Sequence, residues 1–377
     1  MAKSPKRKTL SLMLTHDCNL ACVYCYERAK SGKRISLETA KQAIIKGFSR
    51  CSDDEELDIS FHGGEPFLAF DMLRDICEWV WSQTWSAPYI CFATTNGTLV
   101  HGNITDWVAR NRKRLYLGLS LDGTRDMHNL NRSGSFDLID IDFFLANWPD
   151  QPLKMTVSDM SLPFLAEGIA FLHHKGFRIN ANFAFGMDWS DEGKIDGLTR
   201  QLTSLIQFYL DNPQYEPCEF LAMHIEAINT QSTSMAKWCG TGTEMVAVDV
   251  DGNEYPCQMF LPMVNGKDIL EGRPVDWCDA SSLSDDGCRE CIISPICPTC
   301  YGMNLMERHD PRLRDPYLCA LTKVRAVACS YFQAQLLARN SAVIETPDEA
   351  AAVLRKLRAI EAIQSNTALR KIPHGQS

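Results

Sequence analysis

The stretch Cys18-Asn19-Leu20-Ala21-Cys22-Val23-Tyr24-Cys25 places three cysteines at C-x3-C-x2-C, directly after the apolar run 10–14. Cys thiolates are the usual protein ligands of iron–sulfur clusters, so these three can bind three irons of a 4Fe–4S cubane. The fourth iron then lacks a protein ligand, and an open metal position lets a substrate coordinate. A zinc site completed by His16 is the alternative. A disulfide cluster is disfavoured, because no apolar segment of a signal peptide follows the basic start.

Composition limits the possible binding partners and the cellular location of the protein. With 377 residues the chain can form one large core or two domains. The net charge of −9 argues against a nucleic-acid partner. No run of 18 apolar residues occurs, so we expect no membrane span and a cytoplasmic protein. The 16 cysteines are unusual for such a protein and indicate metal or redox chemistry.

Short β-rich runs alternate with amphipathic segments through the first half of the chain. The expected strands are 9–14, 57–61, 89–95, 115–121, 153–158 and 178–185. The expected helices are 37–48, 70–82, 104–111, 138–148, 164–174 and 194–210. Ser36 is the expected N-cap of the first helix. Six such units in series predict an α/β fold with a parallel sheet, either open or closed into a barrel.

Polar and glycine-rich motifs follow several of these strands, where parallel sheets place ligand sites. Gly63-Gly64-Glu65-Pro66 follows the second strand, and Ser120-Leu121-Asp122-Gly123 follows the fourth. His128-Asn129 and Arg132 come next. Taken alone, the first motif is typical of a tight turn, and Thr95-Asn96-Gly97 after the third strand is a plain turn signal.

A second cysteine array lies in the last third of the chain. Cys239 and Cys257 flank an expected β-hairpin with an Asp-Gly turn at 251–252. Then comes Cys288-x2-Cys291-x5-Cys297-x2-Cys300, followed by Cys319. Alone, this array favours structural zinc. Most of the remaining cysteines, at 51, 77, 91, 218 and 329, are expected to be small buried apolar residues. Helical periodicity returns at 329–337 and 348–363, and 366–377 is expected to be frayed.

The triad, with Tyr24 before its last cysteine, resembles the radical S-adenosylmethionine (SAM) superfamily, and the second array resembles the SPASM domain of its peptide-modifying members. The resemblance implies a partial (β/α)6 TIM-like barrel followed by a small cysteine-rich domain with a β-hairpin and C-terminal helices. The expected division is a basic tail over 1–8, the barrel over 9–235, the SPASM domain over 236–330, and C-terminal helices and a tail over 331–377.

The resemblance also implies ligand sets. Cys18, Cys22 and Cys25 would hold the cluster that cleaves SAM. Gly63, Gly64 and Glu65 match the motif for the SAM amino group, Ser120 and Arg132 match contacts to its ribose and carboxylate, and Gly186 would meet adenine. Asn129 stands where the family has Asp. Auxiliary cluster I would use Cys239, Cys257 and Cys300, with an open iron or a ligand such as Cys278. Auxiliary cluster II would use Cys288, Cys291, Cys297 and Cys319. The spacing before Cys300 is x2, where the family has x3.

The implied activity is reductive cleavage of SAM to a 5′-deoxyadenosyl radical, which abstracts hydrogen from a peptide or protein, with three 4Fe–4S clusters as cofactors. We expect crosslinking of a ribosomally made peptide. The second choice is an anaerobic sulfatase-maturating enzyme, which oxidises Cys or Ser to formylglycine. That family has a general-base Asp directly after the hairpin cysteine, where this chain has Gln258. Asp249 or Asp251 would have to act as the base instead. A structural zinc or iron–sulfur protein is the non-enzymatic alternative. Flavodoxin or ferredoxin is the expected electron donor. Because the triad begins at residue 18, no N-terminal leader-binding domain is expected, and the barrel, the SPASM domain or a separate leader-peptide-binding protein would recognise the peptide.

Overall fold

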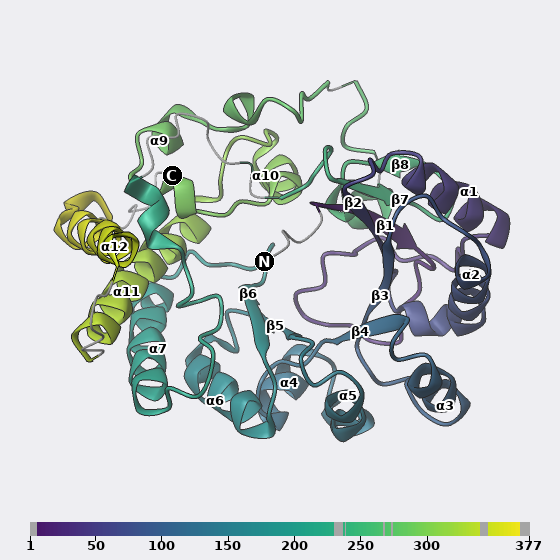
Figure 1. Ribbon diagram of the computed structural model, residues 1–377, viewed down its shortest axis with the longest axis horizontal. Coiled ribbons are helices and arrows are strands. Elements are labelled where there is room, and N and C mark those ends of the chain that lie inside the picture. Colours follow the sequence, from purple (N-terminus) through teal and green to yellow (C-terminus); the bar gives the residue numbers. More distant parts are fainter. Residues whose placement is uncertain are drawn as a thin grey trace. The chain divides into compact units, whose positions relative to one another are not determined.

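The computed structural model describes residues 6–229, 237, 239–266, 268–272, 274–339 and 346–369. The chain forms two compact units. The first contains Met1–Lys154 and Cys239–Cys278, and the second contains Met155–Trp238 and Asp279–Ser377. Figure 1 shows the elements of each unit along the chain.

The first unit is built on a six-stranded sheet. Its strands are β1 (Lys6–Met13), β2 (Glu55–His62), β3 (Tyr89–Thr95), β4 (Leu115–Leu119), β7 (Met245–Val248) and β8 (Glu254–Tyr255), in the order β4-β3-β2-β1-β7-β8. Strands β1 to β4 pair in parallel, and β7 pairs in parallel with β1. Only β8 within this sheet runs antiparallel to its neighbour, β7. The expected parallel α/β arrangement is therefore confirmed.

Helices cover one face of this sheet. The helices α1 (Leu37–Phe48), α2 (Phe70–Ser82) and α3 (Asn103–Arg110) follow β1, β2 and β3, and Figure 1 shows them along the outer side of the strands. The Ser36 side chain caps α1 by accepting from the Thr39 amide, as predicted. A Cβ placed on Gly47 of α1 would lie 3.3 Å from both Leu10 and Leu57, so α1 packs on that face. Since side chains alternate along a strand, Asp58, Ser60 and His62 of β2 lie on the opposite face.

Short elements complete the first unit. They are α4 (Arg125–Asn131), α5 (Ile141–Asn147) and α8 (Pro262–Asn265). The sequence did not predict α4, which the Thr124 side chain caps by accepting from the Met127 amide. Strand β5 (Leu153–Val157) begins in this unit, where Leu121 N–H donates to the Lys154 carbonyl at 3.0 Å.

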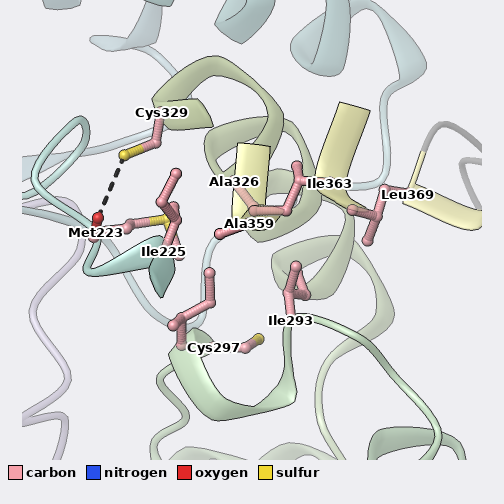
Figure 2. Packing of buried hydrophobic residues seen from close by; sticks show 10 residues of the cluster. Met223, Ile225, Ile293, Cys297, Ala326, Cys329, Ala359, Ile363 and Leu369 are labelled. Atoms are coloured by element: carbon pink, nitrogen blue, oxygen red, sulfur yellow. Dashed lines mark hydrogen bonds between the residues drawn. The ribbon is translucent and has the colours of Figure 1, made fainter. Parts of the chain in front are cut away.

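The second unit contains the pair β5–β6 (β6, Ile179–Phe183) and most of the remaining helices. These are α6 (Leu165–Lys175), α7 (Glu192–Asp211), α9 (Asp286–Arg289), α10 (Tyr301–Arg308), α11 (Pro316–Arg339) and α12 (Pro347–Ser365). Figure 2 shows a core in which Ala326 of α11 and Ala359 and Ile363 of α12 pack with Ile293 and Cys297. Cys329 donates to the Met223 carbonyl in the same core. As predicted, Cys77, Cys91, Cys218 and Cys329 are buried, whereas Cys51 is partly exposed.

Three expected boundaries need correction. The basic tail over 1–8 is wrong at its end, because β1 begins at Lys6 and is held there by ion pairs of Arg7 with Glu56 and Lys8 with Glu55. The boundary at 330 falls inside α11, a continuous helix. Residues 366–369 are not frayed, since they include a helical turn whose Leu369 is 5% exposed. The boundary at 235 and the tail after 369 lie outside the described residues.

Among the described residues, no helix combines the length and the apolar composition that crossing a membrane requires.

Candidate functional site

The loop after β1 carries Cys18, Cys22 and Cys25 as free, partly exposed thiols. Cys25 N–H donates to the Cys22 carbonyl at 3.1 Å, and Leu20 N–H lies 3.4 Å from Cys18 Sγ. Burial raises the pKa of the Cys22 thiol to about 11, against the opposing effect of Arg132. A bound metal deprotonates such a thiol outright. Three sulfur donors on one short loop are chemically suited to a 4Fe–4S cluster.

The Gly63-Gly64 segment packs directly against this loop. Gly64 N–H donates to the Thr15 carbonyl at 3.0 Å, and Glu65 N–H donates to the Asp17 carbonyl at 2.8 Å. A Cβ added to Gly64 would lie 2.2 Å from the Asp17 carbonyl oxygen and 2.9 Å from Cys18 Cβ. Glycine is therefore needed for this close approach of two backbones.

Glu65 is buried and links two loops through hydrogen bonds to its carboxylate. Its carboxylate accepts from Thr95 Oγ1 at 2.7 Å, from Asn96 N–H at 2.8 Å and from Phe67 N–H at 3.2 Å. Burial raises its pKa to about 7, although these hydrogen bonds favour the charged form. The structure thus assigns Glu65 internal partners, and its contact with the SAM amino group stays a prediction.

The Thr95-Asn96-Gly97 loop belongs to the same site, although its sequence predicts only a plain turn. Asn96 Nδ2 donates to Asn19 Oδ1 at 3.0 Å, and Asn19 Nδ2 donates to Thr98 Oγ1 at 2.8 Å. Asn19 lies inside the cysteine stretch. These amides therefore fix the cysteine loop to the end of β3.

Asp122, fully buried after β4, is the central polar residue of this region. Its carboxylate accepts from Arg132 Nε at 2.9 Å and Nη2 at 3.1 Å, from Tyr24 Oη at 2.5 Å and from Asn131 Nδ2 at 3.1 Å. The Arg132 guanidinium also lies 5.3 Å from the centroid of the Tyr24 ring. Asp122 consequently orients Arg132, the predicted SAM contact, beside the cysteine loop. Asp122 belongs to the predicted motif after the fourth strand, but the sequence did not predict this ion pair.

Residues around Asp122 are also largely structural. His128 Nδ1 accepts from Asp122 N–H at 3.2 Å, and burial lowers the His128 pKa to about 4, so its imidazole is neutral. Asn129 Oδ1 accepts from Phe136 N–H at 2.9 Å. Ser120 is buried, and its N–H donates to the Thr95 carbonyl at 2.9 Å. The predicted contact of Ser120 with the SAM ribose stays a prediction.

His16, the proposed fourth ligand of a zinc site, has both ring nitrogens engaged elsewhere. Nε2 lies 2.6 Å from Asp249 Oδ1 and Nδ1 lies 3.0 Å from Ser31 Oγ. The His16–Asp249 contact joins the cysteine loop to the β7–β8 hairpin. The hairpin turns at Gly252, as predicted. In the described ranges, no three His, Cys, Asp or Glu side chains converge as the ligands of one metal ion.

The hairpin cysteines lie in the first unit. Gly242 N–H donates to the Pro256 carbonyl at 3.0 Å, which joins the segments that carry Cys239 and Cys257. Cys239 and Cys278 are exposed, whereas Cys257 is buried. Cys300 and Gly186 belong to the second unit. The ligand set of auxiliary cluster I and the contact of Gly186 with adenine therefore stay predictions.

Four predicted ligands lie around one cavity of the second unit. Cys288, Cys291, Cys297 and Cys319 all line one cavity of about 390 Å³. Cys291 N–H donates to the Cys288 carbonyl at 3.2 Å, and Cys319 lies in the first turn of α11. Burial raises the pKa of the Cys297 and Cys319 thiols. Four thiols around one cavity are a suitable donor set for a further cluster, although ligation itself stays a prediction.

Comparisons with known proteins agree with this geometry. Residues 8–115 match the family model of a 4Fe-4S single cluster domain. An uncharacterised protein of Methanocaldococcus jannaschii is 30% identical over 172 residues, 44% of this chain and 58% of that protein. A cysteine-type anaerobic sulfatase-maturating enzyme of Clostridium perfringens is 23% identical over 286 residues, 67% of this chain and 75% of the enzyme.

Solved structures match over most of the chain. Native anSMEcpe with bound AdoMet and Kp18Cys peptide gives a TM-score of 0.68 at 18% identity, covering 89% of this chain and 99% of that one. Streptococcus suis SuiB bound to precursor peptide SuiA gives 0.51 at 17% identity, covering 83% and 76%. The fold is thus that of the partial-barrel enzymes.

The match to an iron–sulfur domain, the similarity to sulfatase-maturating enzymes and the partial-barrel fold together support an enzyme of the radical SAM/SPASM type. Within this class, the chain is related to the anaerobic sulfatase-maturating enzymes.

Proposed function

We propose that this enzyme crosslinks a ribosomally made peptide, using SAM and three 4Fe–4S clusters. Peptide complexes among its structural neighbours, of anSMEcpe and of SuiB, support a peptide substrate. A cluster on Cys18, Cys22 and Cys25 would supply the electron that cleaves SAM into methionine and a 5′-deoxyadenosyl radical. The protein's task is then to position one substrate carbon and to exclude water.

The observation that carries the choice of reaction is the side chain after Cys257. Gln258 is an amide, and its Oε1 is buried without a hydrogen-bond partner. Removing a proton from a substrate thiol or hydroxyl requires a base within hydrogen-bond reach, and an amide is not a base. The resemblance to sulfatase-maturating enzymes places an Asp at this position, so formylglycine formation lacks its expected base here.

Both substitute carboxylates have partners in the described structure. Asp249 contacts His16 Nε2 at 2.6 Å and accepts from Val250 N–H at 2.9 Å. Asp251 is half exposed and pairs with Lys33 Nζ at 2.7 Å. The buried Asp249 is thus committed to His16 and the backbone, and Asp251 to a surface ion pair. This supports crosslinking over formylglycine formation.

A polar face of the sheet is suited to a peptide. On the side opposite α1, Ser60 Oγ lies 3.1 Å from His62 Nε2, and Asp58 Oδ1 is buried without a hydrogen-bond partner. Lys154 Nζ donates to Thr94 Oγ1 at 3.0 Å. Buried polar groups usually have hydrogen-bond partners, so the unpartnered Asp58 Oδ1 is an acceptor open to a ligand or a water molecule. We propose that the peptide backbone contacts this face.

Mass spectrometry tests the reaction directly. The enzyme is co-expressed with a short open reading frame encoded beside its gene, with flavodoxin or ferredoxin as the electron donor. A crosslink that removes two hydrogens lowers the peptide mass by about 2 daltons. A separate leader-binding protein is added if the peptide alone is not modified.

A sulfatase-derived Cys peptide is the opposing substrate. It tests the second candidate function, formylglycine formation, which the similarity to sulfatase-maturating enzymes favours. Conversion of its Cys to formylglycine lowers the mass by about 18 daltons. We expect no such product, and its formation at the rate of a true maturase would contradict the crosslinking proposal.

A further inference from the structure

Arg314 lies in the loop between α10 and α11 and contacts one of the four cysteines around the second-unit cavity. Its Nη1 donates to Cys297 Sγ and its Nη2 to the Cys297 carbonyl. Arg314 also lines the cavity itself. We propose that Arg314 raises the reduction potential of the cluster held by Cys288, Cys291, Cys297 and Cys319. This inference rests on the proposed function, which supplies that cluster.

A positively charged side chain at this cavity would affect how easily a bound cluster is reduced. Four thiolates around a 4Fe–4S core with charge 2+ give a net charge of 2−, and reduction by one electron adds a further negative charge. Cys297 is only 5% exposed and packs against the apolar core in Figure 2, so water compensates this charge poorly. Hydrogen bonds to cluster sulfurs and nearby positive charge both stabilise the reduced form.

Other charged residues line the cavity but make different contacts. Asp285 Oδ1 accepts from Cys288 N–H at 2.7 Å, which commits it to capping α9. Glu290 and Lys323 also line the cavity, one of each sign. Arg314, in contrast, places a charged donor on the sulfur of a predicted ligand.

Arg314 also lines the neighbouring cavity, which contains Cys300 and Cys319. Its guanidinium therefore borders both the four-cysteine cavity and a predicted ligand of auxiliary cluster I. Because Arg314 comes five residues before Cys319, it joins the Cys297 segment to the segment that starts α11. A charged donor at this position is placed to influence electron transfer through the second unit.

The test is a redox titration of the full, anaerobically reconstituted chain, followed by electron paramagnetic resonance. Dithionite supplies one electron to each cluster, converting the 2+ core to 1+ without making or breaking bonds. In Arg314→Gln, we expect the ratio of reduced to oxidised auxiliary cluster II to fall at least tenfold at a fixed potential, a shift of about 59 mV for one electron. Arg314→Lys, which keeps the charge, should recover part of this shift.

Arg312→Gln is the matched control. Arg312 lies two residues away, pairs with Asp310 and has a half-exposed side chain, so its replacement should leave every potential unchanged. If Arg314→Gln loses iron, the neutral variant Arg314→Met takes its place. An unchanged potential in a neutral Arg314 variant with full iron content overturns this inference alone. A wild-type chain that holds no cluster at these four cysteines overturns the cluster assignment as well.

Discussion

Asp122 is fully buried and carries the ion pair that orients Arg132. Asp122→Asn keeps the shape of the side chain but leaves the buried guanidinium without its counter-charge. Removing one partner of a buried pair typically costs about 3–5 kcal/mol. We therefore expect the free energy of unfolding, measured by denaturant titration, to fall by about that amount. The apparent affinity for SAM should fall as well.

Asp137→Asn is the control for this prediction. Asp137 pairs with Arg125, and the two side chains are 59% and 58% exposed. Such surface pairs are screened by solvent, so this variant should unfold like the wild type. Equal stability of the Asp122 and Asp137 variants would contradict the role assigned to Asp122.

At the scale of elements, the approach of the Gly63-Gly64 segment to the cysteine loop is the most sensitive contact. In Gly64→Ala the new Cβ would collide with the Asp17 carbonyl, so the loop that carries Cys18 must move. We expect this variant to lose one cluster, about four irons per chain, while the second-unit cysteines keep theirs. Iron and sulfide analysis of the reconstituted protein measures the loss.

Gly32→Ala provides the comparison, because no atom lies within 4 Å of its added Cβ. It should bind as much iron as the wild type. Full iron content in Gly64→Ala, with normal electron paramagnetic resonance signals, would show that the loop tolerates displacement.

Local signals explain which elements could be predicted from the sequence. The bounds of α1 and α2 were predicted as observed, because Ser36 caps the first helix and both have an apolar stripe. Helix α4 was missed, since its seven residues are too few for helical periodicity. The hairpin was predicted from its Asp-Gly turn, but its parallel pairing with β1 was not. That pairing joins residues more than 230 positions apart, and no local pattern encodes it.

In the candidate site, too, local patterns predicted some residues, and contacts between distant segments were missed. Spacing identified the cysteines, because ligand residues cluster along the chain. Asp122, Asn96 and Asn19 escaped prediction, since their roles depend on hydrogen bonds between loops that only the folded sheet brings together. Glu65 was predicted to contact the ligand, and the structure adds three internal donors to its carboxylate.

For the whole molecule, ten cysteines fall into predicted ligand groups of three, three and four. The anaerobically reconstituted chain should therefore hold about twelve irons in three 4Fe–4S clusters. Iron, sulfide and zinc analysis of one preparation checks this number. A stable protein with stoichiometric zinc and almost no iron or sulfide would instead support a structural zinc protein.

Reductive cleavage of SAM tests the assignment as a radical SAM enzyme most directly. The reconstituted chain is reduced with dithionite, and 5′-deoxyadenosine is quantified by chromatography in the wild type and in Cys18→Ala/Cys22→Ala/Cys25→Ala. The wild type should form this product. The triple variant should form none above the protein-free background while keeping its auxiliary clusters. Formation of 5′-deoxyadenosine at the wild-type rate by the triple variant, or none by a fully loaded wild type, would contradict the assignment.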